Sequence, residues 1–147
     1  MPGETVDILL VEDSHDDATF FRHALEVSGL RPSMKIARDG AEALAAVFGA
    51  AGQAEAVPIL APRMIVLDLK LPKISGLEVL QRLKANPHTR SIPVVVLSSS
   101  QEKRDLVESY SLGLNSFLVK PMDFDEYTAL VNALGKYWLQ LNQTPKP

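Results

Sequence analysis

Carboxylates stand directly after two apolar runs of this 147-residue chain. Glu12 and Asp13 follow the run at residues 8–11, and Asp68 follows the run at residues 64–67. Short apolar runs without polar alternation are typical of strands buried on both faces of a parallel sheet. Because the carboxyl ends of parallel strands lie along one edge, residues far apart in the sequence can meet there. The pattern predicts an acidic pocket built from three carboxylates.

Two further polar residues follow the other predicted strands. Ser98 ends the β-branched run at residues 92–97, and Lys120 follows the strand predicted at residues 116–119. Clustered carboxylates repel one another, and a divalent cation such as Mg²⁺, which prefers oxygen ligands, relieves that repulsion. A carboxylate beside such a cation can act as a nucleophile toward a phosphoryl group. We therefore predict Asp68 as the nucleophile, with Ser98 and Lys120 as contacts of the phosphoryl oxygens.

Strand and helix patterns alternate five times, which predicts an α/β domain with a parallel sheet. The predicted strands are residues 7–11, 34–37, 63–68, 92–97 and 116–119. The predicted helices are a first one from about Asp16 to a stop at Gly29, and then residues 41–48, 75–86, 101–112 and 123–141. Residues 49–62 are expected to be irregular, with two glycines and two prolines. Asp16 and Asp17 are interpreted only as first-turn acids that suit the helix dipole.

The composition is that of an ordinary globular domain, with 46% apolar and 22% charged residues. The absence of cysteine excludes disulfides, thiolate metal sites and cysteine nucleophiles. A formal net charge of -3 argues against nucleic acid as a direct partner. The sequence shows neither a signal peptide nor an apolar run that approaches the roughly 20 residues of a membrane span. We expect a cytoplasmic protein.

Taken together, these motifs resemble the receiver domain of two-component response regulators, the CheY-like family. The resemblance rests on residues 8–13, on 65–72 with Gly76, on 92–98 and on Lys120–Pro121, and it covers about residues 6–135. It implies a flavodoxin-like, doubly wound five-stranded parallel sheet of strand order 2-1-3-4-5 with helices on both faces. Residues 1–147 are expected to form a single domain. Its core spans about 6–135, a helix extension about 136–142 and a frayed tail 143–147.

The resemblance also implies roles for particular residues. Asp68 is the phosphoacceptor, and Ser98 and Lys120 contact the phosphoryl group. Mg²⁺ or Mn²⁺ is bound by Asp13, Asp68 and the backbone carbonyl of Lys70, with Glu12 acting through water. Ser98 and Phe117 form the switch pair, and the Lys120–Pro121 peptide bond is expected to be cis. Ser98 replaces the commoner threonine, and Glu12 is a frequent variant of aspartate. Residues 49–62 exceed the family minimum, either as a surface embellishment or as part of a kinase contact.

The last predicted helix ends in an apolar and aromatic stretch that contains Tyr137, Trp138 and Leu141. These residues either pack on the protein's own core or form a docking or self-association surface. The ending is similar to small single-domain regulators that are paired with phytochrome-type kinases and often dimerise through this face. A homodimer through the last helices and strand is therefore predicted.

The function implied is that of a phosphorelay protein that takes a phosphoryl group from a sensor histidine kinase, and the similarity to phytochrome-associated regulators implies a kinase of phytochrome type. It is not an enzyme, although it assists its own phosphorylation and dephosphorylation. Its output is expected either through a partner protein, which would contact the last helix, the last strand and the preceding helix, or through onward transfer of the phosphoryl group. A haloacid-dehalogenase-type hydrolase would need an aspartate where Lys70 stands. The remaining alternative is a pseudo-receiver, a binding or dimerisation module without phosphotransfer.

Overall fold

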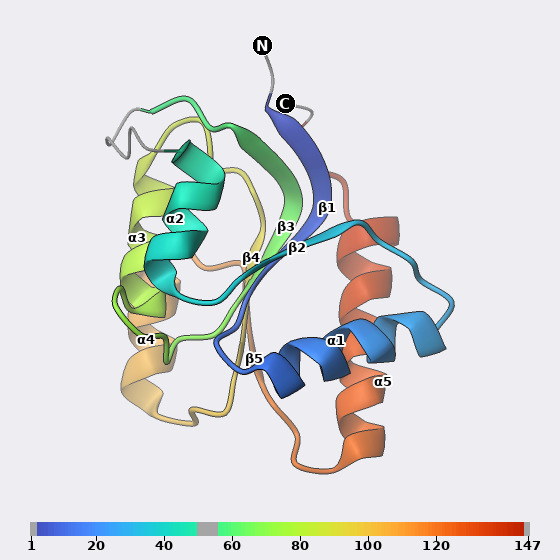
Figure 1. Cartoon of the computed structure of the whole chain (residues 1–147). Helices are drawn as coiled ribbons and strands as arrows, with labels where there is room; N and C mark the ends of the chain where they lie inside the picture. Colours follow the sequence, from blue (N-terminus) through green and yellow to red (C-terminus); the bar gives the residue numbers. More distant parts are fainter. Residues whose placement is uncertain (1–2, 50–55, 146–147) are drawn as a thin grey trace.

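The computed structural model describes residues 3–49 and 56–145. Within them, five parallel strands form one sheet in the order β2-β1-β3-β4-β5, as predicted (Figure 1). The strands are Glu4–Val11 (β1), Met34–Ala37 (β2), Leu60–Leu67 (β3), Val94–Ser98 (β4) and Ser116–Val119 (β5). The strand order reverses between β1 and β3. Open α/β sheets bind their ligands outside the carboxyl ends of the strands at such a reversal.

Helices cover both faces of the sheet. They are His15–Val27 (α1), Gly40–Phe48 (α2), Gly76–Ala85 (α3), Lys103–Ser111 (α4) and Phe124–Gly135 (α5), followed by a π-helical segment, Lys136–Leu141 (η2). In Figure 1, α1 and α5 lie to one side of the sheet, and α2, α3 and α4 lie to the other. This is the flavodoxin-like arrangement that the sequence predicts.

Alternate residues of each central strand point into two separate apolar cores. In β1, Leu9 and Val11 pack toward α2 and α3, whereas Ile8 and Leu10 pack toward α1 and α5. Each fully buried aliphatic side chain contributes about 1.5–3 kcal/mol relative to an exposed one. Burial on both faces therefore explains why the strands read as unbroken apolar runs in the sequence.

Four of the α-helices, α1, α2, α3 and α5, begin after a short polar side chain that caps them. Ser14, Asp39, Ser75 and Asp123 each accept a hydrogen bond from the backbone N–H three residues later. Such caps satisfy backbone donors that the first helical turn leaves unpaired. Each of these four helices follows the carboxyl end of a strand, so the caps also fix the loops that carry the polar strand-end residues.

The structure differs from the predicted elements at β3 and β4. β3 begins at Leu60, three residues earlier than expected, because Leu60 and Pro62 pair with Glu4 and Val6 of an equally extended β1. The prolines that suggested a loop lie near the start of the strand, where a missing N–H is tolerated. β4 begins only after Pro93 and includes Ser98. Of the segment predicted to be irregular, residues 50–55 lie outside the described residues.

The final helix is not uniform to its end. α5 stops at Gly135 and the chain continues as η2, where the N–H of Asn142 donates to the carbonyl of Tyr137 over 2.7 Å. Residues 142–145 have no helical structure, and the last two residues of the predicted tail are not described. No helix in the described parts of the chain has the length and apolar character needed to cross a bilayer.

Candidate functional site

Three carboxylates from two strand ends meet at the carboxyl edge of the sheet. Glu12 and Asp13 follow β1 and Asp68 follows β3, and one oxygen from each lies within 4.8 Å of the other two. Glu12 is 5% exposed, Asp68 is half-buried and Asp13 is exposed. The site is therefore open to solvent at Asp13 and buried at Glu12. The structure brings together the three acids that the sequence placed in one pocket.

Backbone hydrogen bonds hold both acidic strand ends in register. The N–H of Glu12 donates to the carbonyl of Ala37 over 2.9 Å, and the N–H of Asp68 donates to the carbonyl of Val11 over 3.1 Å. The Asp68 carboxylate also accepts a hydrogen bond from the N–H of Lys70 over 3.2 Å. Hydrogen bonds therefore hold both the backbone and the side chain of Asp68 in place.

Gly76, the first residue of α3, sits directly against the Asp68 loop. A Cβ at this position would lie 2.4 Å from the Asp68 carbonyl oxygen and 2.6 Å from the Cα of Leu69. Only glycine permits so close an approach of a helix N-terminus to this backbone. The N–H of Gly76 donates to the carbonyl of Leu69 over 3.0 Å, which closes the loop.

Lys120, which follows β5, supplies the positive charge of the site. Its Nζ lies 2.6 Å from Glu12 Oε1, 3.1 Å from Asp17 Oδ2 and 3.4 Å from Asp68 Oδ2. An ammonium has three donors, and here each has a carboxylate acceptor. The Lys120 side chain is only 14% exposed, so these pairs are poorly screened by water.

Burial and pairing act in opposite directions on the two partners. Burial raises the pKa of Glu12 to about 7, although the hydrogen bond and the charge of Lys120 act to lower it. Burial alone would lower the pKa of Lys120, but its carboxylate partners outweigh that effect and raise the pKa above its ordinary value. At neutral pH Lys120 remains charged in either protonation state of Glu12, because Asp68 and Asp17 also attract it.

Ser98 lies at the end of β4, the strand next to β3, and Phe117 lies on β5, one strand further out. Ser98 is fully buried at the end of β4, and its hydroxyl accepts a hydrogen bond from the N–H of Ser100 over 3.2 Å. The Lys120 N–H donates to the Ser98 carbonyl over 2.8 Å, which ties the ends of β4 and β5 together. Phe117 is half-buried against the core on the α2 and α3 side. Its N–H donates to the hydroxyl of Tyr110 on α4.

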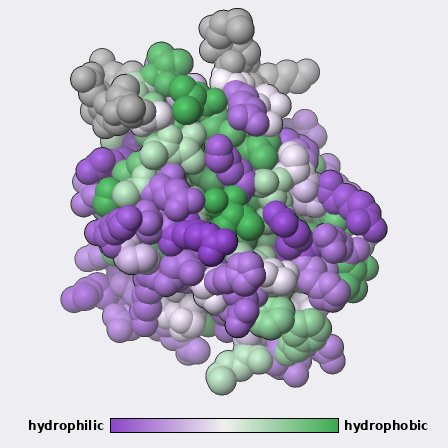
Figure 2. Space-filling view, in the orientation of Figure 1, coloured by the Kyte–Doolittle hydropathy of each residue, from purple (hydrophilic) through white to green (hydrophobic). Residues whose placement is uncertain are grey.

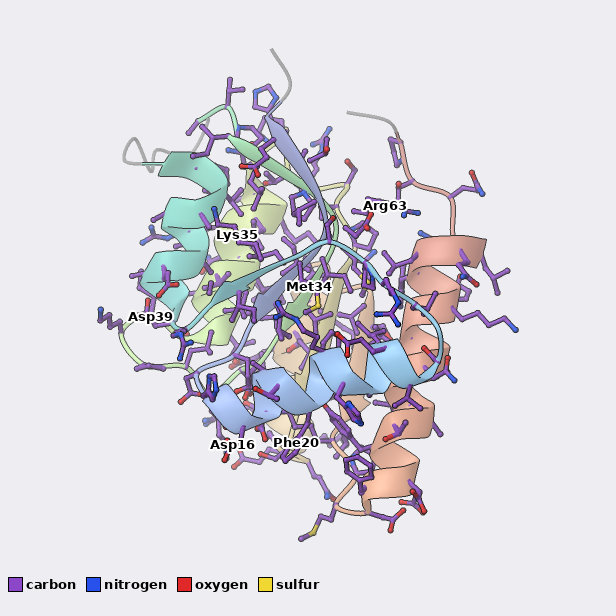
Figure 3. The ribbon with its side chains drawn as sticks, turned by 45° about the vertical axis from the view of Figure 1, so that its right-hand side comes forward. Asp16, Phe20, Met34, Lys35, Asp39 and Arg63 are labelled. Atoms are coloured by element: carbon purple, nitrogen blue, oxygen red, sulfur yellow. The ribbon has the colours of Figure 1, made fainter. Side chains whose placement is uncertain are left out.

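Asp17 joins this site although the sequence interpretation assigned it only to the helix dipole. Its carboxylate pairs with Lys120 rather than pointing away into solvent. Figure 3 labels its neighbour Asp16 at the start of α1; Asp16 is exposed. The spacing does not distinguish Asp17 from Asp16 in the sequence, because both acids suit the first turn of a helix.

The prediction of a cis Lys120–Pro121 bond is wrong. The described residues contain no cis peptide bond. Trans is favoured by only about 0.5–1 kcal/mol before proline, so the dipeptide alone does not dictate the isomer. Lys120 reaches its three carboxylates from the trans arrangement.

The three residues predicted as an interface divide between core and surface. Tyr137 is 50% exposed and Leu141 is 60% exposed, whereas Trp138 packs against the apolar core between the sheet, α1 and α5. The rings of Tyr137 and Trp138 meet edge to face at 4.9 Å. Packing on the core therefore applies to Trp138, and the interface role of Tyr137 and Leu141 stays a prediction.

The donor set fits a hard divalent cation. Three carboxylates that converge on one point supply the oxygen ligands and the negative charge that Mg²⁺ or Mn²⁺ prefers. With Asp68 held beside an ammonium, the same arrangement can place a nucleophilic carboxylate next to charges that stabilise phosphoryl oxygens. The backbone carbonyl of Lys70 and a water-mediated role of Glu12 stay predictions.

The chain is similar to known proteins over nearly its whole length. The model of the response regulator receiver domain matches residues 8–132. The chain is 39% identical over 140 residues to the probable methanogenesis regulatory protein FilR2 of Methanothrix harundinacea, covering 95% of this chain and 88% of that protein. It is 38% identical over 138 residues to response regulator Rcp1 of Synechocystis, covering 94% and 92%.

Two solved structures share the fold over nearly their whole length. The Mn²⁺-bound form of response regulator Rcp1 has a TM-score of 0.82 at 34% identity, covering 97% of this chain and 99% of that one. The phosphorylated cyanobacterial phytochrome response regulator RcpA also has a TM-score of 0.82, at 32% identity and with 98% and 99% coverage.

Proposed function

This chain belongs to the family of response regulator receiver domains, and we propose that Asp68 is its phosphoacceptor. One observation carries the proposal. The Asp68 carboxylate lies 3.4 Å from Lys120 Nζ, in one acidic group with Glu12 and Asp13. In the proposed transfer, an Asp68 oxygen bonds to phosphorus while the bond from phosphorus to a donor histidine nitrogen breaks, and the imidazole keeps that electron pair. Lys120 and Ser98 then bind phosphoryl oxygens.

The proposed cation site lies at the same carboxyl edge of the sheet. We propose that Asp13, Asp68 and the backbone carbonyl of Lys70 hold Mg²⁺ or Mn²⁺, with Glu12 acting through water. When bound, the metal supplies positive charge that offsets the charge of the phosphoryl oxygens. The protein is not proposed to turn over a substrate. Its own residues assist the formation and hydrolysis of its aspartyl phosphate.

Phosphorylation is proposed to shift a two-state surface. The Ser98 hydroxyl, which now accepts from Ser100, turns toward a phosphoryl oxygen, and Phe117 moves into the vacated space. The bond between the Phe117 N–H and the Tyr110 hydroxyl carries that movement to α4. Only such differential contacts can change the populations of the two states. The output surface is then formed by α4, β5 and α5, where Val107 and Tyr110 are exposed.

The phosphodonor is proposed to be a sensor histidine kinase, and the similarity to a phytochrome response regulator favours a phytochrome-type kinase. An apolar surface borders the acidic edge of the sheet. Phe20 on α1 and Phe124 on α5 meet edge to face at 6.3 Å and are 47% and 53% exposed, and Met122 between β5 and α5 is fully exposed. Figure 2 shows apolar side chains at the lower end of the molecule, over the β5–α5 connection, with hydrophilic side chains beside them. A kinase that brings its phosphohistidine to Asp68 would contact this surface.

Self-association is proposed through the exposed side of η2. Tyr137 and Leu141 present apolar area there, while Trp138 anchors the segment to the core. We also propose that residues 1–147 form one receiver domain, with a core of about residues 6–135 and the helix extension at 136–142.

Labelling by acetyl phosphate tests the phosphoacceptor. We expect the intact protein to form a Mg²⁺-dependent adduct, detected as a mass increase, and the Asp68→Asn variant to form none. Asp16→Asn serves as the matched control, because it removes a nearby carboxylate that is exposed. Absence of an adduct on the intact protein would contradict phosphotransfer and leave a binding or dimerisation module without phosphotransfer. An adduct on Asp68→Asn would contradict the choice of nucleophile.

A further inference from the structure

The first turn of α1 uses its acids in an unusual way. The hydroxyl of Ser14, the N-cap residue, accepts a hydrogen bond from the N–H of Asp17 over 3.2 Å. An acidic residue at this third helical position commonly returns the contact by accepting from the N–H of the cap. Here Glu12 Oε2 accepts from the Ser14 N–H over 3.2 Å instead. The Asp17 carboxylate is thereby released from capping and pairs with Lys120 Nζ at 3.1 Å.

The three partners of Lys120 are not equivalent. Glu12 and Asp68 belong to the acidic group that fits a divalent cation, whereas Asp17 does not. A cation bound at that group would attract the same two carboxylates that pair with Lys120, so the pairing of Lys120 with Glu12 and Asp68 would weaken. Asp17 is the one partner that keeps its full attraction for the ammonium.

We propose that Asp17 is a positioning residue for phosphotransfer, which restrains the Lys120 ammonium beside Asp68. This inference rests on the proposed function. A lysine side chain carries about 2 kcal/mol of rotamer entropy, so an unrestrained ammonium would spend less time within reach of a phosphoryl oxygen. The pair joins α1 to the end of β5 across the open side of the site. Asp17 itself is 43% exposed and needs no direct contact with the phosphoryl group.

The test compares two adjacent acids that carry the same charge in the same helical turn. Asp17→Asn removes the partner of Lys120, and Asp16→Asn removes an exposed charge that forms no ion pair among the described residues. We expect the rate constant for labelling by acetyl phosphate at saturating Mg²⁺ to fall about fivefold in Asp17→Asn, the change that about 1 kcal/mol produces. Asp16→Asn should stay within about twofold, and Asp17→Glu should recover part of the rate. Equal losses in the two asparagine variants would overturn the proposal, because they would show a general effect of charge.

A double-mutant cycle shows whether Asp17 acts through Lys120. In a Lys120→Met background, Asp17→Asn should cause no further loss of rate. An undiminished loss in that background would overturn the proposal.

The lysine side-chain NMR signals give a readout that requires no phosphorylation. In protein with ¹³C-labelled lysine, the Cε signal of Lys120 should move in Asp17→Asn and stay in place in Asp16→Asn. An unmoved signal in Asp17→Asn would overturn the positioning role. Failure of the intact protein to be labelled contradicts the proposed function instead. The NMR signal thus separates the two failures.

Discussion

At Lys120, three carboxylates within 3.4 Å share one ammonium, and two of them also fit a divalent cation. The lysine therefore has two opposing effects at the level of single residues. Its charge stabilises buried carboxylates, and it would compete with a bound cation for Glu12 and Asp68. Removing it should separate these effects.

We expect Lys120→Met to lower the free energy of unfolding in EDTA by about 2–3 kcal/mol, because it leaves buried carboxylates without their cation. Added Mg²⁺ should restore much of this loss, since the metal then binds without a competitor. Urea denaturation in EDTA and in Mg²⁺ measures both values. The matched control is Lys73→Met, whose pair with Asp39 spans 3.4 Å at a lysine that is 69% exposed. That variant should change stability by less than about 0.5 kcal/mol in either buffer. A deficit in Lys120→Met that is the same with and without Mg²⁺ would contradict the competition.

Individual residues show where the sequence was sufficient and where it was not. Glu12, Asp13, Asp68 and Lys120 were predictable as one cluster because each follows an apolar strand, and parallel strands end at one edge. Asp17 was not, because a first-turn acid already has a local explanation and its partner is distant in the chain. The isomer of the Lys120–Pro121 bond was predicted wrongly, since it depends on a free-energy difference too small for the dipeptide to determine.

Among the helices, α3 begins directly against the backbone of the Asp68 loop. Gly→Ala within a helix ordinarily stabilises it by about 1 kcal/mol. At Gly76 the added Cβ would lie 2.4 Å from a backbone oxygen, so packing outweighs propensity. We expect Gly76→Ala to lower stability by about 1–3 kcal/mol and to slow labelling of Asp68, because the Asp68 loop must shift. Thermal unfolding and acetyl phosphate labelling measure the two effects.

Gly135, near the end of α5, is the matched control for this substitution. A Cβ there would meet only the terminal methyls of Leu25 and Leu30, at 2.8 and 2.9 Å, which can rotate away. Gly135→Ala should therefore leave labelling unchanged. If Gly76→Ala were labelled as fast as the intact protein, the fixed geometry of the Asp68 loop would not matter for the reaction.

The apolar surface over α1 and the β5–α5 connection yields a prediction about the kinase. Met122→Glu should slow transfer from the cognate phosphorylated kinase about tenfold, because it places a charge in a contact that must lose water. Labelling by acetyl phosphate, which needs no protein contact, should stay unchanged. The control is Val57→Glu, an equally simple change at an exposed apolar residue close to β3's amino end. Equal transfer rates for the two variants would place the kinase contact elsewhere.

A helix or strand could be predicted from the sequence where one local signal, burial or capping, dominated its residues. The β-branched interior of β4 and the capped starts of α2 and α3 were recognised because burial and capping act locally. The first residues of β3 were missed because Pro62 reads as a loop, while its pairing partner lies over fifty residues earlier in β1. The π-helical end of the chain has no signal that we recognise in its sequence.

For the molecule as a whole, alternation and burial were enough to predict a parallel sheet, whereas the strand order came from family resemblance. Two apolar cores on opposite faces fix the sheet between α1 and α5 on one side and α2 and α3 on the other (Figure 1). Because all the strands are parallel, every strand ends at the same edge of the sheet. The chemistry of the site is in this sense a consequence of topology, and η2 lies apart from it as a separate surface.

The exposed side of η2 allows oligomeric state to be tested independently of phosphotransfer. We expect the intact protein to be a dimer and Leu141→Arg to be a monomer, because the substitution places a charge in an apolar contact; the stability of the monomer should change little. Trp138→Ala should instead lower the free energy of unfolding by about 2 kcal/mol, since this ring packs on the core. Light scattering after size exclusion gives the mass, and urea denaturation gives the stability. A Leu141→Arg variant that keeps the mass of the intact protein would exclude this face as the contact, and labelling of Asp68 should proceed in it either way.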